Sequence, residues 1–263
     1  EVARTHAQER NAIAVVGVGQ AFLLGAATFA VAAGPLLLMS GRFVPDLGGD
    51  VDRSARRELG EAFRFVRARP WLWGTLLSAA VGLLAFVGPV EVLVPFVVKN
   101  ELGGGAADLG FVFAAGGCGA VLAAVLMGHR GLPRKHIVFL YVTWTPGPFL
   151  IAGFGVATDL VQMMVVSFLM QALFTAGLIV WATLMHKLVP TELLGRVSSF
   201  DWLVSVSLIP VSFALTGPIA GAIGAETTLI GAGIVAGLAT LAFLFVPGMR
   251  DTERNEQLVN NEH

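Results

Sequence analysis

Long apolar stretches separated by short polar segments dominate the pattern along the chain. Seven of these stretches reach the length of about 20 residues that a helix needs to cross a bilayer. Transmembrane β-strands would be about 10 residues long and would alternate strictly, and the stretches show neither property. The pattern therefore predicts an all-α integral membrane protein with seven transmembrane helices. The seven predicted spans are residues 12–39, 71–98, 109–127, 137–157, 160–185, 202–223 and 228–246.

The composition agrees with this pattern. Hydrophobic residues make up 56% of the 263 residues and charged residues 13%, whereas about 25% of an average soluble domain is charged. So little charge does not cover the surface of a water-soluble enzyme, and the net charge of −1 gives no indication of a nucleic-acid partner. Cys118 is the single cysteine, and no residues have the spacing of a metal site or a catalytic triad. We therefore expect no enzymatic activity, no cofactor and no metal, and the lipid bilayer as a partner.

The polar segments between the predicted spans differ sharply in Lys and Arg content. Segments 40–70, 128–136, 186–200 and the residues after 246 lie on one side and hold 14 of the 17 Lys and Arg residues. The opposite side holds Lys99 and two arginines near the N-terminus. Because cytoplasmic loops are enriched in Lys and Arg, this bias predicts a multi-pass protein of the inner (plasma) membrane with a cytoplasmic C-terminus.

The longest polar segment separates the first predicted span from the other six. Within it, Leu59, Ala62, Phe63 and Val66 follow the i, i+3, i+4, i+7 spacing of one helix face, and arginines occupy other faces. This spacing predicts an amphipathic helix, which either lies on the inner leaflet or forms an ordinary solvated linker. The expected parts of the chain are an N-terminal stub with one span, this linker, a six-helix bundle and a tail. Their bounds are 1–39, 40–70, 71–247 and 248–263.

Two stretches carry a resemblance to a known family. Residues 61–128, which begin EAFRFVRARPWLWG, and residues 189–224, VPTELLGRVSSFDWLVSVSLIPVSFALTGPIAGAIG, resemble transporters of the major facilitator superfamily. Within it, they are similar to the branch of bacterial macrolide-efflux and enterobactin-export proteins. The resemblance extends over residues 12–247 and matches the seven predicted spans to helices six to twelve of a twelve-helix fold. It implies that the chain is incomplete and that the first five helices are missing.

The resemblance also implies a function. The expected activity is secondary active transport, with proton-driven export of small amphipathic molecules of the drug or siderophore type by alternating access. The expected partners are a small-molecule substrate, protons and the missing N-terminal half of the same protein. A membrane scaffold or regulatory partner that transports nothing is the alternative. The chain holds no nucleotide-binding motif that would indicate a primary pump.

Glu91 is the clearest ionisable residue inside a predicted span. It follows Gly88 and Pro89 in the outer part of span 71–98. A charged side chain at the bilayer centre costs about 2.5–3.5 kcal/mol on insertion scales, so ionisable residues in spans usually face a cavity or a pathway. Glu91 is therefore predicted either to line the proton and substrate pathway or to lie in water at the mouth of the helix, close to Lys99.

Asp201 stands at the cytoplasmic start of the sixth predicted span. A carboxylate is favourable at a helix N-terminus, and this alone can account for it. The resemblance implies a sharper role, as an acid that pairs with the arginine-bearing signature loop of the other half and latches one conformation. Arg130, Arg134 and Arg196 are assigned to the same latch. In the corresponding loop of this chain, His129 takes the place of the acid of the family.

Two predicted spans carry polar side chains at helical spacing. One stripe lies in span 160–185, and the other begins at Asp201 and continues to Thr216. Such stripes either line a wet cavity between helices or bond neighbouring helices inside a bundle. The first alternative, together with Glu91, defines a candidate substrate and proton pathway. Its residues are Glu91, Ser167, Gln171, Thr175, Ser205 and Ser212.

Overall fold

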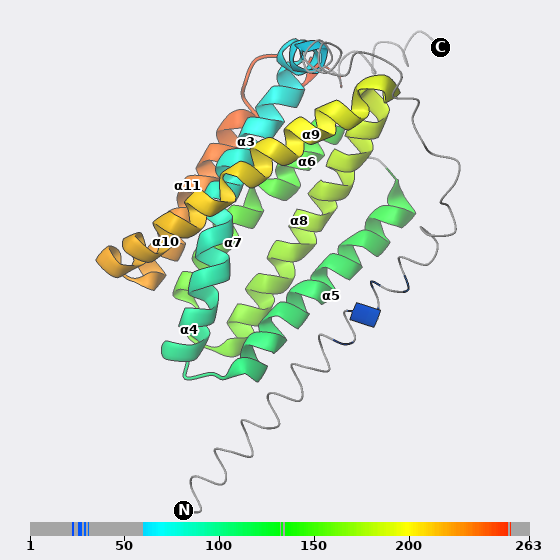
Figure 1. Cartoon of the computed structure of the whole chain (residues 1–263). Coiled ribbons are helices and arrows are strands. Elements are labelled where there is room, and N and C mark those ends of the chain that lie inside the picture. The colour runs from blue at the N-terminus through cyan, green and yellow to red at the C-terminus, as the bar shows by residue number, and fades with distance from the viewer. Residues whose placement is uncertain are drawn as a thin grey trace, which may run out of the picture. The chain divides into compact units, whose positions relative to one another are not determined.

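The computed structural model describes residues 60–131, 133, 135–251 and 253, and five helical residues between 23 and 31. The chain divides into two units, Glu1–Ser54 and Ala55–His263. The predicted span 12–39 lies largely outside the described residues. The second unit holds the helices labelled in Figure 1.

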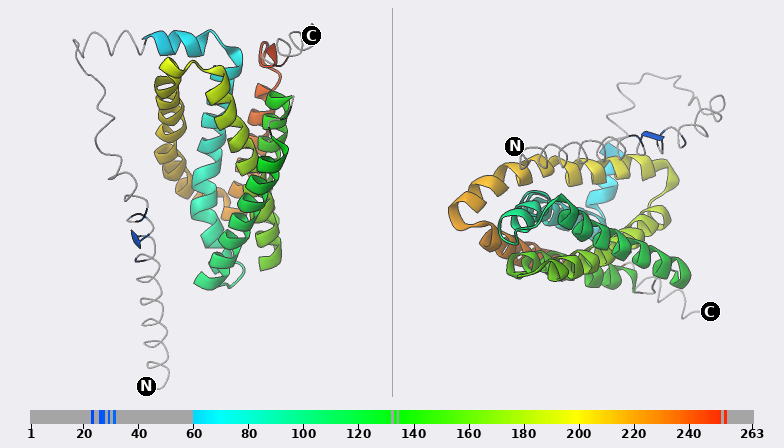
Figure 2. Two further views of the ribbon diagram at one scale, coloured as in Figure 1. Left: turned by 90° about the vertical axis from the view of Figure 1, so that its right-hand side faces the viewer. Right: turned by 90° about the horizontal axis from the view of Figure 1, so that it is seen from below.

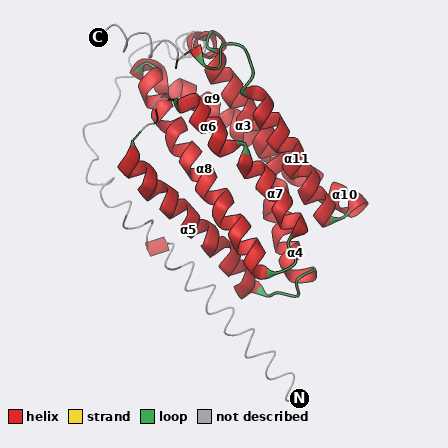
Figure 3. Cartoon of the chain, turned by 180° about the vertical axis from the view of Figure 1, so that it is seen from behind, coloured by secondary structure: helices red, strands yellow, loops and turns green. Residues whose placement is uncertain are grey.

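All regular structure in the described residues is helical (Figure 3). A short helix over 60–67 precedes the first long one. The labelled elements are α3 (Pro70–Gly88), η1 (Pro89–Leu93), α4 (Val94–Asn100), α5 (Ala106–Arg130), α6 (His136–Trp144), α7 (Pro146–Val156), α8 (Leu160–Leu188), α9 (Thr191–Ser207), α10 (Ile209–Ile223) and α11 (Ala225–Phe243).

Local sequence signals set several helix ends. Pro70 occupies the first position of α3, where its missing N–H needs no partner. The Asp159 carboxylate caps α8 by accepting a hydrogen bond from the backbone N–H of Gln162 at 2.9 Å. Gly131 follows α5 with a φ of 68°, a left-handed conformation that favours glycine. These ends confine the loops of the bundle to a few residues each.

Six helical segments among the described residues are long and apolar enough to cross a membrane, and each overlaps one of the six predicted spans from residue 71 onward. Several are built from two labelled elements: the first contains α3, η1 and α4, the third α6 and α7, and the fifth α9 and α10. Proline accompanies each of these breaks, because it lacks the N–H that the helix ladder needs. The six segments are Pro70–Asn100, Ala106–His129, His136–Val156, Leu160–Leu188, Thr191–Ile223 and Ala225–Phe243.

The prediction of a loop over 186–200 is wrong. Helix α8 continues to Leu188, and α9 begins at Thr191. The fifth of the six segments, which corresponds to the predicted span 202–223, therefore starts well before residue 202. Val197 is fully buried in this first part of α9, and neighbouring leucines pack against the same core. The sequence there has one apolar face and several polar ones, and a search for uniformly apolar stretches does not detect such a helix.

The packing of the six spans follows a repeated scheme. The first span packs on the fifth and sixth, and the fourth packs on the second and third. The third and sixth spans also pack on each other, through α7 and α11. Exchanging the first three spans with the last three leaves these contacts unchanged, although the fifth and sixth spans also contact each other through α10 and α11 and the second and third have no comparable contact. The bundle thus has the contact pattern of two three-helix repeats, with α9 and α10 along one side of it (Figure 2).

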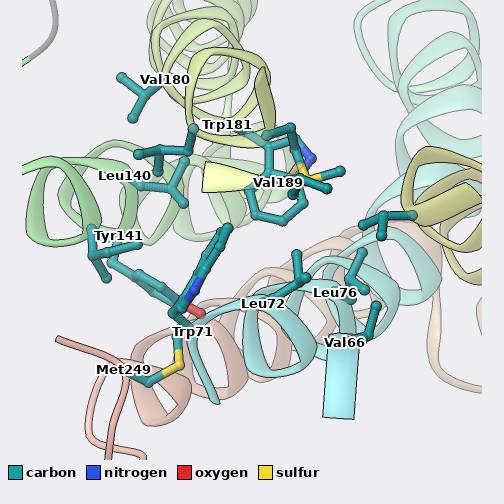
Figure 4. Close-up of a cluster of buried hydrophobic side chains, with 14 of the residues drawn as sticks. Val66, Trp71, Leu72, Leu76, Leu140, Tyr141, Val180, Trp181, Val189 and Met249 are labelled. Carbon is teal, nitrogen blue, oxygen red and sulfur yellow. The ribbon is translucent and has the colours of Figure 1, made fainter. Parts of the chain in front are cut away.

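One of two hydrophobic clusters lies toward the end of the bundle that carries Arg64, Lys187 and Arg250, which we call the basic end. Trp71 is at the centre of this cluster and meets Trp181 edge-on, with ring centroids 6.2 Å apart. Figure 4 shows the two aromatic side chains among aliphatic neighbours from several helices. The cluster joins the starts of α3 and α6 to the ends of α8 and α11.

The short helix over 60–67 contributes to this cluster. Ala62 and Val66 are buried against it, whereas Arg64 and Arg67 are exposed. Phe63 is 53% exposed, and the centroid of its ring lies 6.3 Å from that of Phe200 on α9. The amphipathic helix expected in the linker is therefore present over these residues, and protein covers its Ala62 and Val66 positions.

The start of the tail also packs on the bundle. Met249 is buried in the cluster. The Glu253 carboxylate accepts a hydrogen bond from the backbone N–H of Val138 at 3.0 Å, in the first turn of α6. A carboxylate is favourable at a helix N-terminus, so this contact ties the tail to the basic end of the bundle.

The second hydrophobic cluster lies toward the opposite end, which carries Glu101, Asp159 and Glu226 and which we call the acidic end. Burial, the like charge of Glu226 and a hydrogen bond between the two side chains raise the pKa of Glu101 above its ordinary value of 4.5. Glu101 lies in the loop between α4 and α5, and Glu226 lies in the first turn of α11. The loop and α11 therefore meet through two carboxyl groups.

Replacing Glu101 with glutamine is expected to raise the melting temperature of the protein at about pH 8 and to have little effect at about pH 4. A raised pKa in the folded state means that the folded protein binds this proton more tightly than the unfolded chain. The stability of the unmodified protein then falls as the pH rises from 4.5 through the raised pKa. Thermal unfolding across this pH range measures the effect. Glu192→Gln at the other end of the bundle serves as control, and an equal pH profile for the two variants would contradict the prediction.

Candidate functional site

A cavity of about 460 Å³ lies between the first, third, fourth and fifth spans, and Thr240 of α11 adds to its wall. It extends from His186 and Ser198, near the basic end, to Phe86 close to the middle of the first span. Its volume falls within the roughly 300–1,000 Å³ of small-molecule sites. Most of its wall is apolar, with a few polar groups at fixed places. This combination suits an amphipathic ligand.

Asp201 provides the carboxylate of this cavity. The indole N–H of Trp181 donates a hydrogen bond to Asp201 Oδ2 at 3.0 Å, and the Ser205 hydroxyl donates to Oδ1 at 3.4 Å. Asp201 and Ser205 lie one turn apart on α9, and Trp181 comes from α8. The predicted pathway residue Ser205 and the predicted latch residue Asp201 thus occupy one site. The carboxylate is only half-buried and so remains accessible from the cavity.

A row of aromatic rings forms another part of the wall. Phe86 stacks on Phe174 with ring centroids 6.2 Å apart and planes at 10°. Phe174 stacks on Trp144 at 6.5 Å, and Trp144 lies 6.5 Å from Trp181. The row continues through Trp181 to Trp71 in the core at the basic end. Three spans supply these rings, so the sequence, which shows periodicity only within one helix, gave no signal for the row.

Ser167 and Ser212 lie at helix crossings, and neither lines this cavity. The Ser212 hydroxyl on α10 accepts a hydrogen bond from the backbone N–H of Gly88 at 2.8 Å, where α10 crosses the end of α3. Ser167 on α8 is buried against Gly116 of α5. Each crossing pairs a small polar side chain with a glycine that permits close approach. For these two residues the structure therefore favours helix–helix contact over the predicted cavity lining.

Gln171 and Thr175 also fall outside the lining of the cavity. Both are half-buried on α8. The Cγ atom of Gln171 lies beside Gly116, only 3.0 Å from where a Cβ on that glycine would stand. Gln171 therefore belongs to the contact between α5 and α8. Ser167 and Gln171 of the predicted polar stripe thus lie at the interface of α8 with α5, and none of the three stripe residues lines the cavity.

Glu91 lies in the π-helical turn η1, and its side chain is exposed. The turn starts at Pro89, whose missing N–H interrupts the regular α-helical ladder. Turns of this type often occur at functional sites. Glu91 does not line the cavity that contains Asp201. Glu91 and Asp201, the two carboxylates singled out from the sequence, therefore lie at different places in the bundle. The role of Glu91 stays a prediction.

The basic residues of the predicted latch are placed only in part. Arg196 is half-buried on α9, five residues before Asp201. The side chain of Arg130 and the whole of Arg134 lie outside the described residues. The latch therefore stays a prediction.

The described residues contain no group of three or more His, Cys, Asp and Glu side chains that could hold a metal ion. The chemical features of the site are one carboxylate, the imidazole of His186, several hydroxyls and a row of aromatic rings. No protein-family model, curated protein or solved structure matches the chain.

Proposed function

We propose that this chain is the C-terminal half of a secondary active transporter that exports small amphipathic molecules against an inward flow of protons. The observation that carries the proposal is the cavity at Asp201, set inside a bundle of two exchangeable three-helix repeats. Repeats of this kind, with a site near the bilayer midplane, are typical of transporters that work by alternating access. A membrane scaffold has no need for such a cavity.

The number of helices in each repeat supports this proposal. A repeat of three spans begins on one side of the membrane and ends on the other. The second repeat therefore begins on the side opposite to the one where the first repeat began. The two repeats are then inverted relative to each other. Inverted repeats allow a bundle to present similar surfaces toward both sides of the membrane, which alternating access requires. The resemblance to the major facilitator superfamily, based on residues 61–128 and 189–224, agrees with this arrangement.

The charges at the two ends of the bundle support an orientation in the membrane. Arg64, Lys187 and Arg250 mark the basic end, and the start of the tail packs there. Cytoplasmic loops carry an excess of Lys and Arg. We therefore place the basic end and the C-terminus in the cytoplasm, and the protein in the inner (plasma) membrane.

The exposure of the fifth span supports the proposal that a second bundle forms the other wall of the transport pathway. Only 11% of the most apolar window in Thr191–Ile223 is buried inside the unit. Trp202, Leu203 and Val206 are exposed on the part of α9 that adjoins Asp201, and Trp202 and Val206 also line the cavity. An N-terminal half of the same protein would cover this side and would bring its signature loop toward Asp201. Substrate would bind between the halves, and rocking of one half against the other would expose it to either side.

Proton flux in liposomes tests the proposed function. The natural full-length protein is reconstituted with a pH-sensitive dye inside the vesicles, and a cationic, a neutral and an anionic fluorescent amphiphile are added in turn. A transporter is expected to move protons only when one of these probes is present. Vesicles without protein provide the control. If no probe changes the internal pH above that control, the scaffold is the better account of the chain.

A further inference from the structure

The short helix α6 begins without a side-chain cap of its own. Lys135 precedes the helix and makes no capping hydrogen bond, and the first turn carries no acidic residue. The first N–H groups of a helix have no partner within it. Those of α6 lie among buried side chains, because His136 and Ile137 are 1% and 0% exposed. An acceptor from elsewhere in the chain is therefore needed at this end of α6.

Glu253 supplies such an acceptor from the tail. Its Oε1 atom accepts a hydrogen bond from the backbone N–H of Val138 at 3.0 Å. Val138 is the third residue of α6, and the third N–H of a helix is one that a capping side chain normally binds. Glu253 is only 6% exposed, so little water competes for this bond, and a negative charge is favourable at a helix N-terminus. The tail thus caps α6.

The residues before Glu253 hold the tail in this position. Gly248 has a φ of 87° and turns the chain after α11 toward Pro70, whose ring lies 2.8 Å from where a Cβ on this glycine would stand. Met249 is buried in the cluster at the basic end (Figure 4). Its sulfur atom fills the space that Gly74 leaves on α3. The place of Glu253 at α6 is therefore set by packing on α3.

The opposite end of α6 reaches the cavity. The helix ends at Trp144, and Pro146, which opens α7, lacks the N–H that would continue the hydrogen-bond ladder. Thr143 and Trp144 both line the cavity. A helix rises about 9 Å from Val138 to Trp144. A segment this short and regular moves as one piece, so a shift at its first turn reaches its last.

The contacts of Trp144 depend on the placement of α6. Its indole N–H donates a hydrogen bond to the carbonyl of Phe174 at 3.3 Å, and the two rings stack with their planes at 20°. The indole also packs on Gly177 so closely that a Cβ there would collide with it. In the middle of α6, the hydroxyls of Tyr141 and Thr75 share a hydrogen bond at 3.4 Å. Without the cap, α6 would pivot about Tyr141 and displace Trp144.

We propose that Glu253 is a positioning residue for the cavity, which caps α6 from the tail and thereby fixes Trp144 in the aromatic row. Glu253 does not line the cavity itself and acts through the helix. The positioning of Trp144 is independent of the proposed function, whereas its effect on substrate binding rests on that function.

Fluorine NMR tests the positioning on the natural full-length protein, labelled with fluorotryptophan and held in detergent without substrate. The signal of Trp144 is the one that is lost in Trp144→Phe, and the signal of Trp202 is identified in the same way. Glu253→Ala is expected to shift the Trp144 signal and to leave the Trp202 signal in place, because Trp202 lies on α9. A Trp144 signal that stays unchanged in this variant would overturn the proposal.

Two further variants sharpen this test. Glu253→Gln keeps an acceptor for Val138 but loses the charge, and it is expected to shift the Trp144 signal by a smaller amount. It also keeps the test decisive if the alanine variant does not fold, since an unchanged Trp144 signal in Glu253→Gln would then overturn the proposal. Asp251→Ala removes an exposed carboxylate from the same tail and is expected to leave the signal unchanged. A shift as large as that of Glu253→Ala would contradict a specific role of the cap.

Proton flux in liposomes connects the positioning to transport, with whichever of the three fluorescent amphiphiles drives flux in the unmodified protein. Glu253→Ala is expected to raise the half-saturating amphiphile concentration severalfold while the maximal flux stays nearly the same, because the cavity wall is altered and Asp201 is not. An unchanged half-saturating concentration would overturn the effect on substrate binding. If no amphiphile drives flux, the proposed function fails, whereas the fluorine signals still decide whether Glu253 positions Trp144.

Discussion

Replacing Gly119 with alanine is expected to lower the free energy of unfolding of the bundle by about 1–3 kcal/mol. Gly119 lies on α5 where this helix contacts α8, and an added Cβ would collide with the backbone carbonyl of Phe168. Backbone atoms do not move aside as a flexible side chain does. The two helices must separate instead, and the contacts between the second and fourth spans are weakened along their length.

Gly117 offers a matched control on the same helix. A Cβ at Gly117 meets no described atom within 4 Å, and alanine is a better helix residue than glycine by roughly 0.5–1 kcal/mol. Gly117→Ala is therefore expected to leave stability unchanged or slightly higher. Thermal unfolding of both variants in detergent measures the difference. Equal melting temperatures for Gly119→Ala and Gly117→Ala would contradict the close contact of α5 with α8.

Replacing Asp201 with asparagine is expected to reduce substrate-dependent proton flux about tenfold or more. In the proposed function Asp201 pairs with the arginine-bearing signature loop of the other half. Loss of one member of a desolvated charge pair costs about 2–5 kcal/mol in interfaces, and each 1.4 kcal/mol corresponds to about a factor of ten. Asp201 is only half-buried, so the lower part of that range applies. Flux is measured in liposomes with whichever of the three fluorescent amphiphiles drives proton flux in the unmodified protein. Wild-type flux in this variant would mean that Asp201 takes no part in transport.

Glu91→Gln in the same assay distinguishes the contribution of Glu91 to proton flux from that of Asp201. Glu91 is exposed and lies outside the cavity, so its replacement is expected to reduce flux less than that of Asp201. A loss as large as that of Asp201→Asn would place Glu91 in the proton pathway. Unchanged flux would leave it as a carboxylate in water. Glu192→Gln, which removes a charge of the same kind outside the cavity, controls for the change in net charge.

The membrane character of the chain and the approximate positions of its long apolar helices from residue 71 onward follow from local properties of the sequence. A spanning helix must satisfy all its backbone hydrogen bonds internally and must be apolar over about 20 residues, and both requirements are local. The start of the fifth span was missed, because the buried side of α9 near Val197 exists only where the helix packs on the core at the basic end. An amphipathic turn of that kind does not stand out from a polar loop in a single sequence.

Which polar residues share a site depends on how the helices pack against one another. Ser167, Ser205 and Ser212 follow the same helical spacing rules, yet only Ser205 reaches the cavity, while Ser167 and Ser212 fill helix crossings opposite glycines. Spacing along one helix defines a face but not the neighbour that this face meets. The aromatic row from Phe86 to Trp181 depends even more on packing, since its rings come from three spans and approach one another only after the helices assemble.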